Sequence, residues 1–438
     1  MAVPASIADA ARSADAGEEL YALVSELYPI CRSITGDGVR HTLRRIGAEI
    51  PLELAEVPTG TQVFDWTIPR EWNIRDAYVK DAAGNRVVDF RACNLHVVGY
   101  SVPVHERMQL AQLRPHLTTI PEHPRWIPYR TSYYREDWGF CLAHETLLSL
   151  PEAEYEVRID STLEDGHLTY GECFLPGETQ EEVLVSAHVC HPSLANDNLS
   201  GVAVATLLAR TLARLPRRLS YRFVFVPGTI GAITWLHTNQ GRTERIAHGL
   251  VLTCVGDPGT VTYKRSRRGN APVDRAVAHV LEHSGDGFQL LDFTPDGYDE
   301  RQYCSPGFDL PVGCFMRTPH HRFPEYHTSA DDLGFVRPES LADSFRKLLS
   351  ALSVLEQDCR YVTTNPHCEP QLGRRGLLRS AGGRKDESVR ELALLWVLNL
   401  SDSRHSLLDI AERSGLEFGT VKAAADALRE HELLKEVE

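Results

Sequence analysis

From about residue 155 onward, short apolar segments alternate with longer helical ones, and this alternation limits the possible folds more than any other feature. The strand candidates are residues 155–159, 182–187, 219–226 and 247–255, and the helix candidates between them are residues 199–215 and 230–241. Strands that alternate with helices in this way form a sheet sandwiched between helices. The sequence therefore predicts an α/β fold.

Changes in residue composition and hydrophobic pattern along the chain indicate further domains. Between residues 62 and 159, short β-type segments are separated by Pro, Gly and Asn, and four of the six tryptophans fall there. We expect this stretch to be a β-rich domain inserted into the α/β domain, which then comprises residues 17–61 and 160–362. Residues 1–16 contain no long apolar segment, and we expect them to form a disordered start.

The end of the chain has a separate helical pattern. A Pro-, Gly- and Arg-rich segment at residues 363–383 precedes it. Residues 406–414, Gly415 and residues 417–431 then follow a helix-turn-helix pattern, and a short terminal strand would complete a wing. We expect residues 363–438 to form a linker and a winged helix-turn-helix domain.

The composition excludes several classes of protein. Hydrophobic residues make up 42% of the 438 residues and charged residues 24%, which is typical of a soluble globular protein. No apolar run approaches the roughly 18 residues that a membrane span needs, and the start lacks the apolar core of a signal peptide. The ten cysteines include no CxxC pair. We expect a cytoplasmic protein with reduced cysteines.

The first group of candidate functional residues lies at the end of a predicted strand. An apolar strand leads into His188, and Asp197 stands just before the helix predicted at residues 199–215. Imidazole and carboxylate groups are the zinc ligands used outside sulfur sites, and α/β folds bind ligands at the carboxyl ends of their strands. A helix cap and a hydrogen-bonded core histidine would explain the same residues. The segment alone does not decide between these interpretations.

Two further polar segments follow later in the chain. Residues 322–332 contain Glu325 and His327, and residues 297–307 contain the adjacent acids Asp299 and Glu300. Taken alone, the first segment could equally be a polar loop that caps the next helix. The second segment alone is explained by charged side chains in contact with solvent.

Together, the three segments resemble the sequence motifs of proteins with the zinc aminopeptidase-like fold. This superfamily also includes the glutaminyl cyclases. The order is His188, then Asp-Asn-x-Ser-Gly from Asp197, then Pro-Glu-x-His-Thr-x-x-Asp-Asp around His327. Residues 226–231 and 299–307, with the segment after Tyr326, are similar to a bacterial aminopeptidase-like family known mainly as domains of unknown function. The resemblance implies a three-layer, phosphorylase/hydrolase-like sandwich with an inserted β-domain and a C-terminal winged helix.

The same resemblance shows which residues of a two-zinc site are missing. A two-zinc aminopeptidase normally has His-x-Asp, but here Cys190 stands two residues after the histidine. A Glu-Glu pair, which supplies a general base and a ligand, falls on Gly228 and Thr229. A further ligand aspartate falls on Thr253, and the next acid is Asp257. A site with two metal ions is therefore not expected.

The remaining residues imply one catalytic zinc ion per chain, held by His188, Asp197 and His327. Three such ligands leave an open position for a water molecule. His191 competes as a ligand because it lies only a short loop beyond His188, and Cys190 is a weaker candidate.

We expect Glu300 to replace the missing general base, while Asp299 orients a ligand or a substrate amine. Glu325 is expected to support the loop of His327, because a metal-bound histidine usually has a carboxylate or carbonyl partner.

Residues 126–140 form an aromatic segment with interleaved arginines. Such a segment suits a rim that stacks on a sugar or another ring and pairs with a carboxylate, although the same aromatics would also suit the core of the β-rich domain. The candidate substrate-binding residues are Tyr133, Tyr134, Trp138 and Arg301.

We therefore expect a zinc-dependent hydrolase that cleaves an amide or peptide-like bond in a small or short peptide-like substrate. The resemblance implies polysaccharide or secondary-metabolite biosynthesis. Two alternatives remain open, namely a catalytically inactive binding protein and a ligand-sensing regulator that uses the winged helix.

The charge of the C-terminal domain argues against DNA as its partner. Residues 384–438 contain 8 Lys and Arg residues against 12 Asp and Glu residues, a net charge of −4, and the whole chain has a net charge of −14. DNA-binding modules depend on a basic surface that neutralises phosphates. We expect this domain to form subunit contacts or to cover the catalytic domain. The winged helix and the inserted domain are the candidate contact surfaces of a homo-oligomer.

Gel-shift titrations at near-physiological salt test this expectation. The protein should show no sequence-dependent DNA binding below micromolar concentration, because its winged helix lacks the basic surface. Tighter, sequence-dependent binding would overturn the expectation and support the regulator hypothesis.

Overall fold

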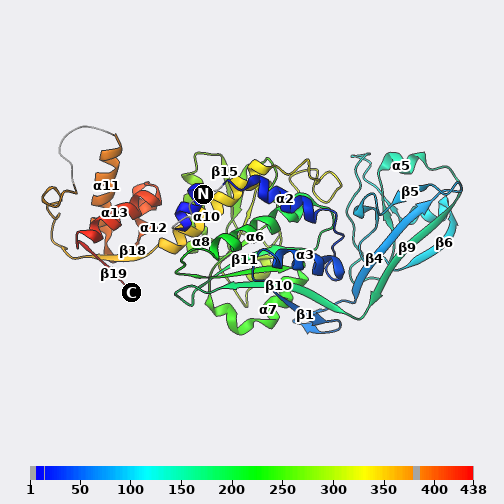
Figure 1. Cartoon of the computed structure of the whole chain (residues 1–438), viewed down its shortest axis with the longest axis horizontal. Helices are drawn as coiled ribbons and strands as arrows, with labels where there is room; N and C mark the ends of the chain where they lie inside the picture. Colours follow the sequence, from blue (N-terminus) through cyan, green and yellow to red (C-terminus); the bar gives the residue numbers. More distant parts are fainter. Residues whose placement is uncertain (1–5, 14, 378–384, 438) are drawn as a thin grey trace. The chain divides into compact units, whose positions relative to one another are not determined.

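The computed structural model describes residues 6–13, 15–377 and 385–437 (Figure 1). The chain forms two compact units. The first contains the residues up to Ala271 together with Gly287–Arg346, and the second contains Pro272–Asp286 and the residues from Lys347 onward.

An eight-stranded sheet forms the centre of the first unit, in the order β1-β10-β12-β11-β13-β16-β14-β15. Its strands are β1 (Glu53–Pro58), β10 (His167–Leu175), β11 (Glu182–His188), β12 (Ser220–Val226), β13 (Ile246–Leu252), β14 (Val261–Lys264), β15 (Phe288–Leu291) and β16 (Val312–Met316). Strands β12, β11, β13 and β16 are mutually parallel. Every residue of β11, β12 and β16 is buried, as expected for strands covered on both faces. The predicted α/β fold is confirmed, and the carboxyl ends of these strands meet at one edge of the sheet.

Helices cover both faces of this sheet (Figure 1). The helices are α2 (Gly17–Leu27), α3 (Asp37–Gly47), α6 (Gly201–Leu212), α7 (Ile230–Thr238), the short α9 (Glu300–Tyr303) and α10 (Pro338–Gln357), which continues into the second unit. The connection from β11 to β12 and the connection from β12 to β13 run in opposite directions along the sheet. Because both connections are right-handed, α6 and α7 lie on opposite faces. The result is the predicted three-layer sandwich. Within the described ranges, no helix has the length and apolar character needed to cross a bilayer.

A β-rich module is inserted between β1 and β10. Its largest sheet is antiparallel, in the order β5-β4-β9-β6, and consists of β4 (Glu71–Lys80), β5 (Arg86–Asp89), β6 (Val104–Gln109) and β9 (Glu154–Glu164). The module also contains β2 (Gln62–Val63), β3 (Trp66–Thr67), β7 (Leu117–Thr118), β8 (Phe140–Cys141), α4 (Leu110–Leu113) and α5 (His144–Ser149). Because β1 and β10 are antiparallel neighbours, the module is the loop of a long hairpin and leaves the main sheet uninterrupted. The predicted end of the module, at residue 159, lies inside β9.

The start of the chain is helical where the structure describes it. Residues Ile7–Ser13 form α1, in which Ile7, Ala10 and Ala11 are buried. The prediction of a disordered start is therefore wrong for these residues, because their small apolar side chains are spaced for one face of a helix. Residues 1–5 and 14, which belong to the same prediction, lie outside the described residues.

The second unit contains the predicted winged helix. Its elements are α8 (Pro272–Glu282), the end of α10, β17 (Arg360–Thr363), α11 (Lys385–Leu400), β18 (Asp402–Ser406), α12 (Leu407–Ser414), α13 (Phe418–Glu430) and β19 (Leu434–Val437). Ser406 and Asp409 form a capping box at the start of α12, and Gly415, with φ of 69°, ends it. The strands form an antiparallel sheet in the order β18-β17-β19, so the module begins with β17, just before the predicted boundary at residue 363. Residues 378–384 of the predicted linker lie outside the described residues.

Helix α8 belongs to this unit although it is distant in sequence. Arg275 forms ion pairs with Asp409 and Glu412 of α12, and Nε2 of His279 accepts a hydrogen bond of 3.0 Å from the backbone N–H of Phe418. These contacts attach α8 to the helix-turn-helix.

Candidate metal centre

The predicted metal ligands lie at the carboxyl edge of the parallel strands. His188 is the last residue of β11, and Asp197 lies in a short π-helical segment, Ala195–Ser200, that leads into α6. The peptide bond between Asp197 and Asn198 is cis. His327 lies in the loop after β16 and has a positive φ of 56°. The fold thus brings together residues that are up to 139 positions apart, the span from His188 to His327.

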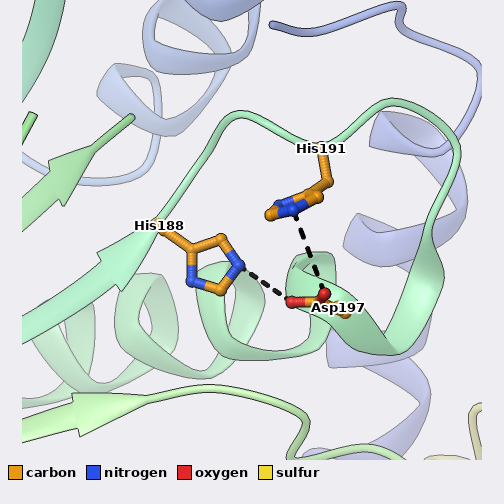
Figure 2. A group of neighbouring side chains, drawn as sticks. All are labelled: His188, His191 and Asp197. Atoms are coloured by element: carbon orange, nitrogen blue, oxygen red, sulfur yellow. Dashed lines mark hydrogen bonds and ion pairs between the residues drawn. The ribbon is translucent and has the colours of Figure 1, made fainter. Parts of the chain in front are cut away.

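The carboxylate of Asp197 lies at the centre of the site. Its Oδ1 is 2.9 Å from Nε2 of His188, and its Oδ2 is 3.0 Å from Nε2 of His327 and 4.0 Å from Nε2 of His191. The hydroxyl of Tyr298 donates a hydrogen bond of 2.6 Å to the same Oδ2. Figure 2 shows the rings of His188 and His191 turned toward the carboxylate.

The protonation states suit a metal site. Burial alone raises the pKa of Asp197, but the facing histidines His191, His188 and His327 outweigh it and hold that pKa well below its usual range. Burial lowers the pKa of His191 to about 3, although the charge of Asp197 acts in the opposite direction. Asp197 is therefore an anion and His191 a neutral imidazole at neutral pH, which are the forms that bind metal ions.

The donor set fits zinc. The ligand atoms of His188, His191 and Asp197 all lie within 4.8 Å of one another, and His327 contacts the second oxygen of the same carboxylate. Imidazole nitrogen and carboxylate oxygen are ordinary zinc ligands, and three protein ligands with one open position are typical of a catalytic site. The structure thus brings together the three predicted ligands and adds His191, which the sequence analysis named as a competitor.

A second buried carboxylate holds the loop that carries Asp197. The two oxygens of Asp331 accept hydrogen bonds from the backbone N–H groups of Asn196, at 2.6 Å, and Asp197, at 2.9 Å. Burial, together with the nearby charges of Asp197 and Asp257, raises the pKa of Asp331 to about 8, against the effect of those two hydrogen bonds. Asp331 therefore fixes the position of the central ligand through its main chain.

Asp257 does not face the cluster. Its carboxylate accepts hydrogen bonds from the side chains of Thr318, at 2.6 Å, and Asn196, at 3.1 Å, and from the backbone N–H of Gly259, at 2.8 Å. The side chain of Thr253 is buried and lies 3.6 Å from the sulfur of Cys254. The carboxylate of Asp257 is thus engaged outside the group formed by His188, His191 and Asp197.

The inserted module forms one side of the site. The backbone N–H of Tyr129 donates to the carbonyl of His327 at 2.8 Å, and the N–H of Ser329 donates to the carbonyl of Ile127 at 2.8 Å. The ring of Tyr129 lies edge-on to His191 and His327, with centroids 5.2 and 5.1 Å apart. Glu325, the predicted support of this loop, accepts a hydrogen bond from Thr328 through its main-chain carbonyl. The module therefore helps to position His327.

The site opens on a cavity of 320 Å³. Its lining includes His191, His327, Tyr298 and Cys190 from the α/β domain and Tyr129 and Tyr133 from the inserted module. Burial raises the pKa of Cys190 to about 12, so the thiol is protonated. Its sulfur accepts a hydrogen bond of 3.1 Å from the backbone N–H of Gly228.

The two predicted catalytic acids have different surroundings although they are adjacent. Glu300 is fully buried, and its Oε1 lies 2.5 Å from Nζ of Lys264 on β14. Asp299 is 1% exposed, and its Oδ1 accepts a hydrogen bond of 2.8 Å from the backbone N–H of Thr229. The other oxygen of Asp299 is buried and has no hydrogen-bond partner among the residues that the structure describes. Burial raises the pKa of Asp299 to about 6, while the charge of His188 opposes the shift.

The position of Asp299 coincides with a gap noted in the sequence. The resemblance places the Glu-Glu pair of a two-zinc aminopeptidase at Gly228 and Thr229. Asp299 reaches the backbone of this segment from a different loop. A buried carboxylate is therefore present beside the segment that lacks one.

The predicted substrate-binding residues separate into two groups. Tyr133 lines the cavity of the metal centre, and Nη2 of Arg301 is 3.5 Å from Oγ1 of Thr229 on its wall. Trp138 instead stacks on His116, with centroids 3.7 Å apart, and Tyr134 lines a different cavity.

Sequence reasoning did not single out Tyr298 or Tyr129. Tyr298 directly precedes Asp299 in the polar loop, and Tyr129 lies within the aromatic segment, so each stood beside a stronger signal. Only the fold shows that they contact the ligands.

Comparisons with known proteins agree with this structure. The family model described as a domain of unknown function (DUF4910) matches residues 21–358, and a winged helix-turn-helix model matches residues 359–436. A Clostridium acetobutylicum protein is 52% identical over 423 residues, with 97% of each chain covered. That protein is provisionally named a polysaccharide biosynthesis protein with an aminopeptidase-like domain.

Solved structures share the fold. A crystal structure from Clostridium acetobutylicum, provisionally named a peptidase, has a TM-score of 0.93 and 50% identity, with 98% of each chain covered. A zinc aminopeptidase from Bacillus subtilis has a TM-score of 0.56 and 14% identity, covering 77% of this chain and 94% of that one. A peptidase M28 precursor from Shewanella amazonensis has a TM-score of 0.54 and 16% identity, covering 80% and 95%. The predicted aminopeptidase-like fold is confirmed.

Metal analysis tests the candidate ligands. We expect the protein to bind one zinc ion per chain, and Asp197→Asn to abolish binding because it removes the charge that all three imidazoles face. Variants His188→Ala, His191→Ala and His327→Ala should each weaken binding by more than the roughly 10–100-fold typical of changes outside the ligand shell. Elemental analysis and calorimetric titration give the stoichiometry and the affinity.

The control is His248→Gln, which changes a histidine on β13 that lies outside the cluster. It should bind zinc as the parent protein does. Two ions per chain, or full occupancy in Asp197→Asn, would contradict the assignment.

Proposed function

We propose that this chain, which belongs to the DUF4910 family, is a zinc-dependent hydrolase that cleaves an amide or peptide-like bond in a small substrate. One observation carries the proposal: a fully buried carboxylate is faced by three imidazoles, and two of them, His191 and His327, line a 320 Å³ cavity. The shared fold with a zinc aminopeptidase supports it.

His188, His191 and Asp197 would hold the zinc ion, with His327 beside them as a further ligand or as a substitute for one of the three. When bound, zinc supplies Lewis acidity, which polarises a carbonyl group and lowers the pKa of a water molecule.

Tyr298 orients the central ligand. Its hydroxyl donates to Asp197 and lies 2.7 Å from the hydroxyl of Tyr326, and its ring stacks on His188 with centroids 4.4 Å apart. The phenol therefore fixes one carboxylate oxygen and one imidazole together. Since it also lines the cavity, it can contact a substrate next to the ligands.

Asp299 is the residue best placed to act as general base. One of its oxygens is anchored by the N–H of Thr229, and the other is free to accept a proton, having no partner among the described residues. A pKa of about 6 makes the group an anion at neutral pH and still close to the operating range of a base. Glu300 also has buried oxygens without a hydrogen-bond partner among the described residues, but it differs from Asp299 in its ion pair with Lys264.

The opposite wall of the cavity belongs to the inserted module. Tyr129 and Tyr133 present aromatic rings, and the exposed Arg130 adds a positive charge. Such a wall suits a substrate with a ring and an anionic or hydroxyl-rich group. With the name of the Clostridium acetobutylicum relative, this favours an amide substrate from polysaccharide biosynthesis.

A second candidate function is binding without hydrolysis. The observation that favours it is the segment Gly228–Thr229, which has no carboxylate of its own. A screen of aminoacyl and N-acyl amides distinguishes the two candidates, because a binding protein would turn over none of them.

Asp299→Asn tests the assignment of the base. We expect the variant to keep its fold and its zinc and to lose about 10²–10⁴-fold in kcat, since the amide cannot accept the proton. In the parent protein the ionised form is the active one, so kcat/KM should fall as the pH decreases through about 6. The variant should lack this acidic limb. A parent-like kcat in Asp299→Asn would contradict the role.

Glu300→Gln provides the matched comparison at the adjacent position. It leaves the buried Lys264 without its anionic partner, and breaking a buried ion pair costs about 3–5 kcal/mol. The main effect should be a lower melting temperature, measured by thermal denaturation. If kcat is lost while the melting temperature is unchanged, Glu300 is the base, as the sequence analysis predicted.

A further inference from the structure

The inserted module contains a second cavity, of 260 Å³, that is separate from the metal centre. Its lining includes Thr67, Arg70, Tyr100, Tyr134, Arg135 and Glu136. All of these residues lie between β3 and the segment that precedes β8, within the module. The cavity is slightly smaller than the roughly 300–1,000 Å³ typical of ligand pockets, so it suits one small ring.

Tyr134 lines this cavity, and Trp66, which is not part of the lining, packs against Tyr134. Tyr134 is 53% exposed and Trp66 is 41% exposed, and their ring centroids are 5.6 Å apart with an angle of 61° between the planes. Leaving such rings in water forfeits the burial energy that they would contribute to the core. Exposed apolar surface next to a cavity is typical of a ligand-binding site.

The rim of the cavity is polar and charged. Arg70 forms an ion pair with Glu136, and Arg135 forms one with Asp137 at 2.6 Å. Arg70 and Glu136 are 41% and 69% exposed, so both can also bind a ligand. Guanidinium and carboxylate groups are planar and can bind two adjacent polar atoms at once.

We propose that this cavity binds a pyranose ring, as the sugar portion of the substrate. A pyranose has an apolar face of C–H groups that packs on aromatic rings, and adjacent hydroxyls at its edge that pair with a guanidinium or a carboxylate. Trp66 and Tyr134 supply the first kind of contact, and Arg70 with Glu136 supplies the second. A nucleobase fits less well, because two rings at 61° cannot enclose a flat ring between parallel planes.

The two cavities share a wall. Tyr100 lines the second cavity, and its ring centroid is 5.1 Å from that of Tyr133, which lines the cavity of the metal centre. The cavities are therefore adjacent, and the proposed substrate would place its amide at the candidate metal centre and its sugar on Tyr134. This link between the cavities rests on the proposed function, whereas sugar binding itself does not.

Saturation-transfer NMR with the full-length protein tests the inference. The probes are the methyl glycosides of N-acetylglucosamine, galactose and glucuronic acid, with adenosine as a comparison. At least one glycoside should receive saturation on the C–H protons of one face. Trp66→Ala and Tyr134→Ala should each weaken its binding by at least about tenfold, which is 1.4 kcal/mol.

The matched control is Phe174→Ala, which removes an exposed aromatic ring on β10, away from the cavity. It should bind the glycoside as the parent protein does, and circular dichroism should show all three variants folded. Saturation of none of the glycosides, saturation of adenosine alone, or unchanged binding in Tyr134→Ala would each overturn the inference.

The amide screen separates this inference from the proposed function. Glycoside binding without hydrolysis of any amide would reject the hydrolase and leave the sugar site standing. Hydrolysis of an amide without glycoside binding would support the hydrolase and reject the sugar site.

Discussion

Asp197 keeps an ionised carboxylate in a position that water does not reach, and the rest of the site is arranged around that charge. An isolated charge in such a position is very costly, so each group that faces it must be a hydrogen-bond donor or a group able to become positive. His188, His327 and Tyr298 meet this requirement at 2.6–3.0 Å. The same arrangement that stabilises the anion also places nitrogen ligands where a cation would bind.

The geometry of this cluster depends on two distant parts of the chain. Asp331 holds the backbone of Asp197 from the loop after β16, and Tyr129 of the inserted module holds the carbonyl of His327. The strand end alone positions only His188. The candidate metal centre therefore depends on the sheet, on the loop after β16 and on the module together.

Sequence patterns predicted the parts that depend on local order. The alternation of strands and helices predicted the α/β sheet. The polar segment at the end of β11 made His188 and Asp197 candidates, and the resemblance to the aminopeptidase-like family made them predicted ligands. The roles of Asp299 and Glu300 could not be separated in this way. They are adjacent, and their difference comes from Thr229 and Lys264, which are 70 and 36 residues away from Asp299 and Glu300, respectively. Similarly, nothing in the aromatic segment distinguishes Tyr133 from Tyr134, although they line different cavities.

The place of the module in the topology has a consequence for how such proteins diverge. Since β1 and β10 are paired neighbours, replacing the module between them leaves the hydrogen bonds of the main sheet intact. New recognition surfaces can therefore arise in the module at little structural cost. The contact between Tyr129 and His327 makes this freedom incomplete. Any exchange that alters the contact also alters the geometry of a candidate ligand, so the cavity wall and the candidate metal centre cannot change independently.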